Sequence, residues 1–277
     1  MKKIINKNKT LKPVNKQVNK PENKPVNKPE NKPENKPENK PVNKQEIIKI
    51  TWSNENKYNF SLSDLETHII NSFNNAEKYI SKITPDIINM EGMSGIKTRH
   101  FYNNLLNKED SRYLEIGTWK GSSVCSAMCA NKAKVVCIDN WSEFGGPKKD
   151  FLINFNKFKG NNEAFFIESD CFKLDITNLP KFNIYMYDGN HTEDSHYKAL
   201  VHYYNCLDDV FIFIVDDWNW KDVRDGTFNS FKELKLTVLY EKEIRTSNND
   251  EHSIVGSPEQ LAWHNGIYVA ILKKFVL

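Results

Sequence analysis

Apolar residues follow two different periods along this chain, and the change falls near residue 110. Before it, residues 61–83 and 96–106 repeat apolar positions at helical spacing, and Ser61 is a suitable N-cap for the first segment. After it, short runs rich in β-branched and aromatic residues alternate with helical or mixed segments. Because the runs are apolar without strict alternation, they are typical of parallel strands buried on both faces. The runs are residues 112–116, 133–139, 164–169, 182–188 and 210–216.

The C-terminal part has a different pattern. Residues 234–243 and 266–275 are two further strand candidates, and the sequence between them contains no convincing crossover helix. They favour an antiparallel pair that closes one edge of the sheet. The polar, irregular segment 244–264 between them is a candidate lid. The pattern therefore predicts a doubly wound α/β sheet in a domain spanning residues 45–277, with a helical extension over residues 45–110.

Residues 1–44 have a composition that sets them apart from this domain. From residue 12 onwards they cycle through "PENK" and "PVNK", and proline at that frequency prevents a helix. We expect an extended, disordered tail, which is either a solvated spacer or a weak tether to a polyanion or surface. Thirteen lysines against four glutamates give the tail a charge of +9, whereas the whole chain carries +3. The domain is thus mildly acidic, near −6, and we expect no nucleic-acid partner for it.

Other compositional features point to a soluble, cytoplasmic protein. The basic N-terminus is not followed by an apolar run of signal-peptide length, and no later run approaches 18 apolar residues, so no membrane partner is expected. The five cysteines are an odd number without a CxxC pair, which favours reduced packing residues over disulfides or zinc. Homo-oligomerisation is left open by the sequence.

The first candidate for function is the turn "EIGTWKG" (115–121), at the carboxyl end of the first predicted strand. Ligands collect at this end of doubly wound sheets, and a glycine turn before a helix suits an anionic group. The turn matches neither the dinucleotide fingerprint nor the P-loop. Taken alone, it can be a helix start that simply needs glycine. Acidic residues follow the next strands as well: Asp139 can accept both hydroxyls of a ribose, and Asp170 with Cys171 lies where an adenine ring would lie.

This ordered set resembles the class I S-adenosylmethionine-dependent methyltransferases, whose first motif reads E-x-G-x-x-x-G. The resemblance covers roughly residues 85–275 and implies a seven-stranded sheet of order 3-2-1-4-5-7-6 with strand 7 antiparallel. Its "GMSG" segment (92–95) resembles a small-residue segment that covers the cofactor in several of these enzymes. The resemblance implies that S-adenosylmethionine is the cofactor. The cofactor-binding residues that it implies are Glu115, Gly117, Thr118, Gly121, Asp139, Asn140, Asp170 and Cys171.

A second group of acidic residues follows the fourth and fifth predicted strands. Neighbouring strands lie about 5 Å apart, so Asp188, Asp216 and Asp217 can converge. Three carboxylates this close repel one another unless a cation lies between them, and Mg²⁺ suits oxygen ligands. Alternatively, Asp188 and Asp216 only cap strands and form turns. The pattern resembles the metal-dependent O-methyltransferases, the branch with catechol and macrolide-sugar enzymes, although Asn190 stands where this branch often has another Asp.

A general base is the last element of the predicted site. His191 lies three residues after Asp188, where the catechol branch has a basic residue, and histidine suits proton transfer near neutral pH. A histidine in a polar turn is also often a surface or supporting residue. Trp218, Trp220 and Trp263 can wall an acceptor pocket, or they can be core residues.

We therefore predict methyl transfer to a hydroxyl of a small-molecule acceptor, a sugar or a phenol, with Asp188 and His191 as catalytic residues and with help from a divalent metal. Two other interpretations stay open. The first is an enzyme of this fold with other chemistry, including a metal-independent methyltransferase. The second is a non-catalytic module that binds the cofactor weakly.

Overall fold

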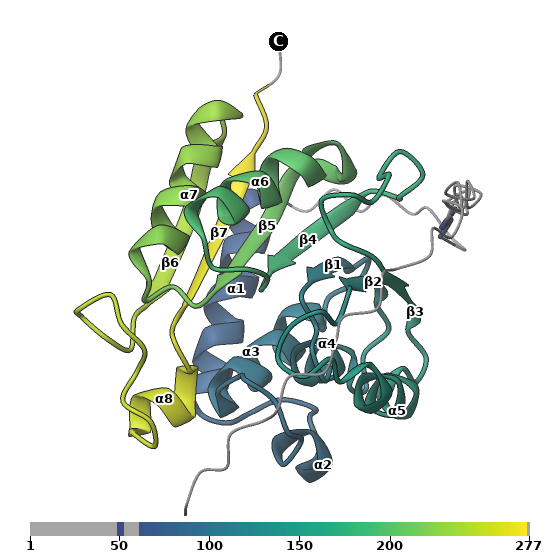
Figure 1. Cartoon of the computed structure of the whole chain (residues 1–277), viewed down its shortest axis with the longest axis vertical. Coiled ribbons are helices and arrows are strands. Elements are labelled where there is room, and N and C mark those ends of the chain that lie inside the picture. The colour runs from purple at the N-terminus through teal and green to yellow at the C-terminus, as the bar shows by residue number, and fades with distance from the viewer. Residues whose placement is uncertain (1–48, 53–60, 276–277) are drawn as a thin grey trace, which may run out of the picture. The chain divides into compact units, whose positions relative to one another are not determined.

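The computed structural model describes residues 49–52 and 61–275, and a seven-stranded sheet lies at its centre (Figure 1). Its strand order is β3-β2-β1-β4-β5-β7-β6. Strands β1 to β5 are mutually parallel, whereas β7 runs antiparallel to both β5 and β6. The predicted α/β sheet and its antiparallel edge are confirmed. The strands are β1 (Arg112–Ile116), β2 (Lys134–Asp139), β3 (Glu163–Glu168), β4 (Phe182–Tyr187), β5 (Leu207–Asp216), β6 (Thr237–Ile244) and β7 (Ile267–Lys273).

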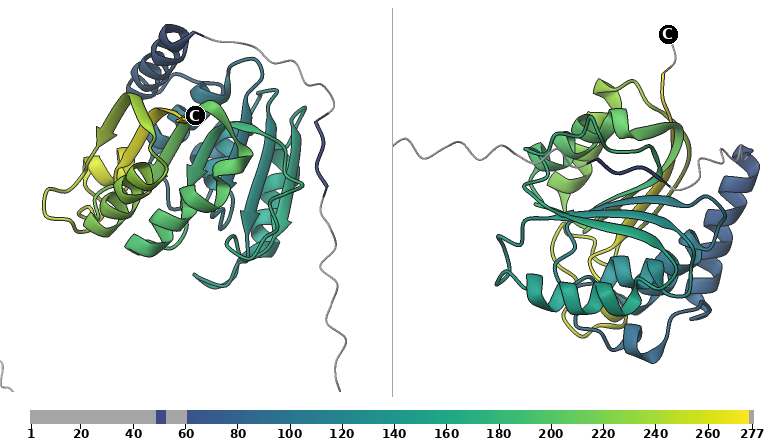
Figure 2. Two further views of the ribbon diagram at one scale, coloured as in Figure 1. Left: turned by 90° about the horizontal axis from the view of Figure 1, so that it is seen from above. Right: turned by 90° about the vertical axis from the view of Figure 1, so that its right-hand side faces the viewer.

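Helices cover both faces of the sheet (Figure 2). One face carries α6 and α7, and the other carries the N-terminal helices together with α4, α5 and α8. This division is expected when parallel strands connect through helices, because both faces must be buried. The helices are α1 (Leu62–Glu77), α2 (Pro85–Ile88), α3 (Ile96–Leu106), α4 (Ser122–Met128), α5 (Lys148–Phe158), α6 (Glu193–Tyr203), the 3₁₀ turn η1 (Tyr204–Cys206), α7 (Lys221–Glu233) and α8 (Pro258–Trp263).

Side chains of each strand alternate between two hydrophobic cores. In β1, Tyr113 belongs to the core under α3 and α4, whereas Leu114 belongs to the core under α6 and α7. In β5, Ile214 and Phe213 divide in the same way. Glu115 is two residues beyond Tyr113 and therefore faces the α3 side. The alternation thus decides which core each acidic strand-end residue approaches.

Several helix boundaries differ from the sequence prediction. The first helix ends at Glu77 rather than at residue 83, because Tyr79 has a left-handed φ of 56° and the amide of Ile80 donates to Asn75 O at 2.8 Å. This hydrogen bond is the one that closes a Schellman motif. Between β6 and β7 the structure has the short helix α8, where the sequence suggested no convincing helix. The short α2 and the longer α5 were also not predicted as separate helices.

The predicted tail, residues 1–44, lies outside the described residues. Within the described part of the chain, no helix combines the length and the hydropathy that a membrane crossing requires.

Candidate active site

A cavity of about 410 Å³ extends along the carboxyl ends of β1 to β5. It begins at the turns after β1, β2 and β3, where a cofactor was predicted, and continues to the turns after β4 and β5, where the acidic group was predicted. Of the predicted site residues, the cavity is lined by Gly117, Asp139, Asn140, Asp170, Cys171, Asp188, His191 and Asp217. Glu115, Thr118, Gly121 and Asp216 are not among its lining residues. Met93, from the predicted covering segment, also lines it.

The turn after β1 needs glycine for a reason internal to the protein. Gly117 has a φ of +85°, and a Cβ atom on it would lie 1.9 Å from the carbonyl oxygen of Asp188. The glycine therefore permits a close approach of the β4 end to the β1 end, in a conformation that L-residues avoid. Gly121 has the same φ and is the N-cap of α4, facing the ring of Phe151. Both glycines thus bring protein segments together. Gly117 also lines the cavity, so its expected place beside a ligand stays a prediction, whereas Gly121 is not among the lining residues.

Asp139 connects the turns after β1 and β2. One carboxylate oxygen accepts the backbone amides of Thr118 and Trp119 at 2.7 and 2.8 Å, and the other accepts the amide of Trp141 at 2.6 Å. The Thr118 hydroxyl donates to the first of these oxygens as well, at 3.3 Å, so the accepting capacity left for a ribose is on the second oxygen, which among the described residues accepts only the Trp141 amide. Asp139 thus organises the site as well as lining it, which the sequence did not suggest.

Two indole groups strengthen the same connection. Trp141 donates its Nε1–H to Trp119 O at 2.8 Å, and Trp119 donates its own to Phe144 O at 3.0 Å. All three aromatic residues have positive φ values and line the cavity. Sequence reasoning missed these residues, because positive φ at a tryptophan or phenylalanine has no signal in the residue type.

The residues predicted near an adenine lie together at the far end of the cavity. Asp170 accepts the amide of Phe172 at 3.1 Å and pairs with Lys173 at 2.7 Å. Cys171 is half-buried, and burial raises the pKa of its thiol to about 12, so it is a neutral wall residue. Asn140 is exposed, and its side-chain oxygen accepts the amide of Ser142 at 3.0 Å.

Glu115 is separated from the cavity and fully buried. Its two carboxylate oxygens accept hydrogen bonds from Ser123 Oγ at 2.6 Å and from the Tyr113 hydroxyl at 2.7 Å. Burial raises the pKa of Glu115 to about 7, although these two hydrogen bonds oppose the shift. Its contacts are therefore with β1 and α4, behind the turn that was expected to hold the cofactor.

Asp188, His191 and Asp217 converge at the other end of the cavity. Each offers one potential ligand atom, and these three atoms lie within 4.8 Å of one another. His191 Nε2 lies 2.8 Å from one carboxylate oxygen of Asp217, and Asn265 Nδ2 donates to the other at 2.7 Å. Burial alone would raise the pKa of Asp217, but the hydrogen bonds of His191 and Asn265 bring it below its ordinary value. Burial raises the pKa of Asp188 well above its usual range, with a further contribution from the nearby charges of Asp216 and Asp217.

Asp216 takes a position different from the one predicted. It is buried beneath the site, and its Oδ1 has no hydrogen-bond partner within the described residues. Burial and then the charge of Asp217 raise the pKa of Asp216 well above its usual range. The group of potential ligand atoms thus contains His191 in the place where Asp216 was expected. Two carboxylates and an imidazole still form a donor set that fits a divalent cation.

The three tryptophans that were considered for an acceptor pocket have separate environments. Trp220 lines the cavity, with its ring centroid 4.3 Å from that of His191. Trp218 is fully buried and stacks on Tyr268 at 4.2 Å, and Trp263 is buried against Phe73 at 5.7 Å. Only Trp220 among these three therefore belongs to the cavity, and the other two are core residues.

Comparison with known proteins adds structural relatives and no sequence relatives. No family model matches the chain, and no curated protein matches it. Among solved structures, it is similar to the O-methyltransferase from Bacillus cereus in complex with SAH, at 12% identity and a TM-score of 0.45, covering 76% of this chain and 90% of that one. It is also similar to the O-methyltransferase TomG from Streptomyces achromogenes, which is involved in tomaymycin synthesis and was solved in complex with SAM. The identity is 13% and the TM-score is 0.45, and the match covers 74% of this chain and 89% of that one.

The fibrillarin/Nop5p complex is a further match, at 10% identity and a TM-score of 0.39, covering 61% of this chain and 74% of that one. Similarity at these levels says nothing about the reaction or the substrate of this chain. The function must be argued from the cavity itself.

Proposed function

We propose that the protein transfers the methyl group of S-adenosylmethionine to a hydroxyl of a small molecule. The observation that carries this proposal is that one cavity joins the turn of Gly117 and Asp139 to the group of Asp188, His191 and Asp217. The first part suits an adenosine and a methionine chain. The second part suits a hydroxyl that must lose its proton.

The cofactor supplies an activated methyl group when it is bound, and the residues of the chain align and deprotonate the acceptor. Asp139 accepts a ribose hydroxyl with its Oδ1, which among the described residues accepts only the Trp141 amide. His191 is the base, because Asp217 contacts its Nε2 and fixes the ring, so that the other nitrogen, Nδ1, can take the proton. Holding an acceptor oxygen about 3 Å from the methyl group provides much of the rate acceleration.

A divalent cation, Mg²⁺ in our prediction, would be held by Asp188 and Asp217. When bound, it lowers the pKa of a coordinated hydroxyl. His191 and Asn265 would then support the ion by orienting the carboxylate of Asp217, as hydrogen-bond partners of metal ligands commonly do. The Oδ1 of Asp216, which has no hydrogen-bond partner in the described part of the chain, lies behind this group, and a bound ion would offset the repulsion among the three carboxylates.

The test separates cofactor binding from transfer. Full-length protein is incubated with S-adenosylmethionine and a panel of glycosides and phenols, with and without excess EDTA, and formation of S-adenosylhomocysteine is measured. We expect product formation that depends on an acceptor and is abolished by EDTA or by Asp188→Ala, while calorimetry shows unchanged affinity for S-adenosylhomocysteine. Full activity in EDTA would reject the ion and leave a metal-independent methyltransferase. Cofactor binding without transfer to any hydroxylated acceptor would favour the non-catalytic module.

A further inference from the structure

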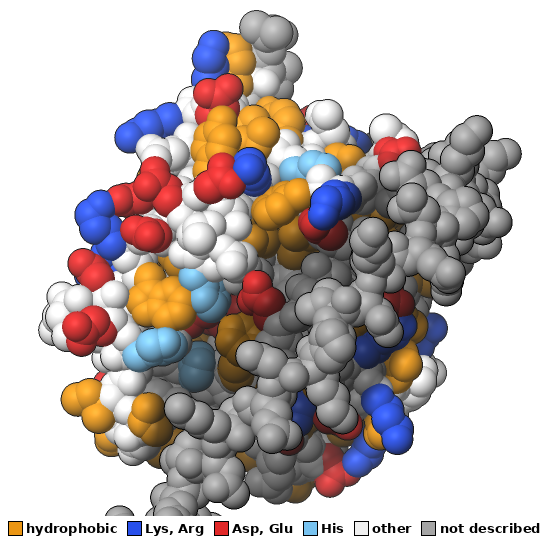
Figure 3. Space-filling model, in the orientation of Figure 1, with side chains coloured by type: hydrophobic (Ala, Val, Ile, Leu, Met, Phe, Trp, Pro, Cys, Tyr) orange, Lys and Arg blue, Asp and Glu red, His pale blue; other side chains and the backbone are white. Residues whose placement is uncertain are grey.

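One wall of the cavity is built from histidine, tryptophan and asparagine side chains, and the proposed chemistry uses only one of them, Asn265, as a partner of Asp217. Trp220, His252, His264 and Asn265 all line the cavity beside Asp217. The Trp220 ring makes edge contacts with two histidines, at 4.3 Å to His191 and 4.7 Å to His252 between centroids. Figure 3 shows histidine side chains gathered next to hydrophobic and acidic side chains on the face above α8. We call Trp220, His252, His264 and Asn265 the outer wall.

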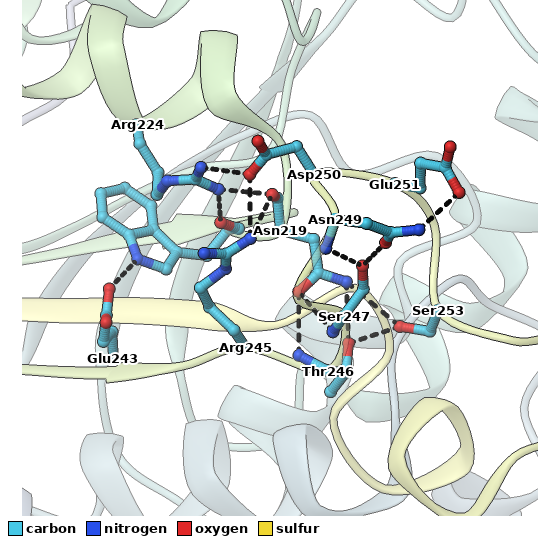
Figure 4. A network of polar contacts seen from close by, with 11 residues as sticks. Asn219, Arg224, Glu243, Arg245, Thr246, Ser247, Asn249, Asp250, Glu251 and Ser253 are labelled. Atoms are coloured by element: carbon cyan, nitrogen blue, oxygen red, sulfur yellow. Dashed lines mark hydrogen bonds and ion pairs between the residues drawn. The ribbon is translucent and has the colours of Figure 1, made fainter.

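The loop that carries His252 is held firmly by a polar network (Figure 4). Asn219 is fully buried; its Nδ2 donates to Thr246 Oγ1 at 2.9 Å and its Oδ1 accepts the amides of Thr246 and Ser247 at 2.8 and 3.2 Å. Asp250 pairs with both Arg224 and Arg245. These contacts fasten residues 245–253 to the turn between β5 and α7 and to α7 itself. The predicted lid segment therefore presents His252 from a fixed position.

The remaining two residues of the outer wall are also fixed in place. His264 has φ 51° and ψ −121°, a conformation that favours glycine, and its carbonyl accepts hydrogen bonds from Thr246 Oγ1 and Ser253 Oγ at 2.7 and 2.6 Å. Asn265 is buried, and its Nδ2 lies 2.7 Å from Asp217 Oδ1 and 3.0 Å from His252 Nδ1. The outer wall is thus connected directly to the carboxylate beside which transfer is proposed.

The outer wall presents hydrogen-bonding groups around one aromatic ring. Within the described residues, His252 and His264 use only Nδ1 in hydrogen bonds with other side chains, which leaves Nε2 of each ring for a ligand. Asn190 also lines the cavity nearby. Several polar groups around a half-buried indole match a ring with hydroxyls on its edge and C–H groups on its face. A phenol ring would offer fewer hydroxyls to the same groups.

The charge of the cavity lining adds a second constraint on the acceptor. Among the described lining residues there is no lysine or arginine, whereas five carboxylates line it: Asp139, Glu143, Asp170, Asp188 and Asp217. Arg99, which lies close enough to act on His264, directs its guanidinium to carbonyl oxygens of Ile87 and Met90. Asp170 is paired with Lys173, so even with a divalent cation on Asp188 and Asp217 the carboxylates of Asp139 and Glu143 remain, and a phosphate or carboxylate group on the acceptor would be repelled.

We propose that the outer wall is the acceptor subsite and that it selects an uncharged, polyhydroxylated ring over anionic rings and over phenols. Trp220 supplies the face against which the ring lies, and His252 and His264 hydrogen-bond its hydroxyls. This assignment rests on the proposed function, because it places the ring next to Asp188 and Asp217.

The experiment measures binding in two steps on full-length protein. Calorimetry with S-adenosylhomocysteine comes first, since failure at this step overturns the proposed function rather than the subsite. Saturation-transfer NMR on the complex then compares neutral methyl hexosides, hexose 6-phosphates, glucuronate and catechol as probes. We expect saturation transfer to neutral hexosides and signals at least several-fold weaker for the anionic sugars and for catechol. Stronger signals from an anionic sugar or from catechol, or no hexoside signal in a complex that binds S-adenosylhomocysteine, would overturn the subsite.

Variants locate the hexoside within the cavity. Trp220→Ala and His252→Ala should each weaken hexoside binding about three- to tenfold, whereas Trp220→Phe should retain most of it, because an aromatic face remains. The control is Leu261→Ala, at an α8 residue that is 60% exposed and outside the cavity lining, and it should bind like the unmodified protein. Hexoside binding that is unchanged in both Trp220→Ala and His252→Ala would reject the outer wall as its site.

Discussion

Replacing Asp139 by alanine tests whether this residue both organises the site and contacts the cofactor. The change removes the acceptor for three backbone amides, those of Thr118, Trp119 and Trp141. A hydrogen bond to a charged group contributes about 1.5–3 kcal/mol, but Asp139 is only half-buried and water can replace part of it. We therefore expect a total loss of about 2–4 kcal/mol in the free energy of unfolding.

A loss of this size has a measurable consequence. For a domain of this length it lowers Tm by about 5–15 °C, which differential scanning fluorimetry detects readily. The Tm of Asp139→Asn should lie between those of the unmodified protein and of Asp139→Ala, because the single side-chain carbonyl oxygen of asparagine can still accept the amides of one turn. Affinity for S-adenosylhomocysteine, measured by calorimetry, should fall at least about tenfold in the alanine variant, as the ribose also loses its acceptor.

The control for this experiment is Asp194→Ala, at an exposed residue of α6 that pairs with Lys198. A surface pair of this kind contributes little, so Tm should change by less than about 2 °C. An Asp139→Ala variant with unchanged Tm would refute the organising role. A variant with lowered Tm but full affinity for S-adenosylhomocysteine would refute the contact with ribose.

Three further changes test other parts of the account. His191→Ala should lower turnover with cofactor affinity retained, and the deficit should shrink at high pH, where hydroxide replaces the base; a deficit that is constant with pH would move the base elsewhere. Burial raises the pKa of Glu115 to about 7 from an ordinary 4.5, so the folded state holds the proton more tightly than the unfolded state does. The stability that the protonated Glu115 contributes is therefore lost as pH rises from about 4.5 to 7. Glu115→Gln should therefore flatten the dependence of Tm on pH in that window, and an unchanged slope would contradict the assignment. Gly117→Ala should destabilise the fold by at least about 3 kcal/mol in chemical denaturation, because its Cβ would lie 1.9 Å from the carbonyl oxygen of Asp188. At Gly145, which has φ +83°, an added Cβ would meet no atom of the described residues within 4 Å apart from its chain neighbours, so Gly145→Ala should show only the backbone strain of about 1–2 kcal/mol.

The sequence predicted the sheet well because buried parallel strands have a strong local signal. Residues 112–116 and 182–188 are apolar runs without alternation, and they correspond to β1 (Arg112–Ile116) and β4 (Phe182–Tyr187). The order of the strands came from the resemblance of a few strand-end residues to a known family. The short α2 and α8 were not predicted, because helices of one or two turns depend on tertiary contacts more than on their own pattern.

The details of the site were harder to predict because they depend on side-chain direction and on unusual backbone conformations. Asp216 and Asp217 are adjacent in sequence, yet the left-handed φ of 54° at Asp217 turns its side chain into the cavity and leaves Asp216 buried below. Nothing in the residue types predicts that turn. His191 had been assigned a catalytic role, but its contact with Asp217 could come only from the structure. His252 lies in the irregular segment and Asn265 lies between α8 and β7, both far along the chain, so no spacing pattern connects them to Asp217.

A calorimetric titration shows whether the cavity at the strand ends binds S-adenosylmethionine. Full-length protein is titrated with S-adenosylhomocysteine and, separately, with NAD. We expect saturable binding of S-adenosylhomocysteine at one site per chain, weakened in Asp139→Ala, and no binding of NAD. Binding of NAD by a protein that binds neither S-adenosylhomocysteine nor S-adenosylmethionine would contradict it.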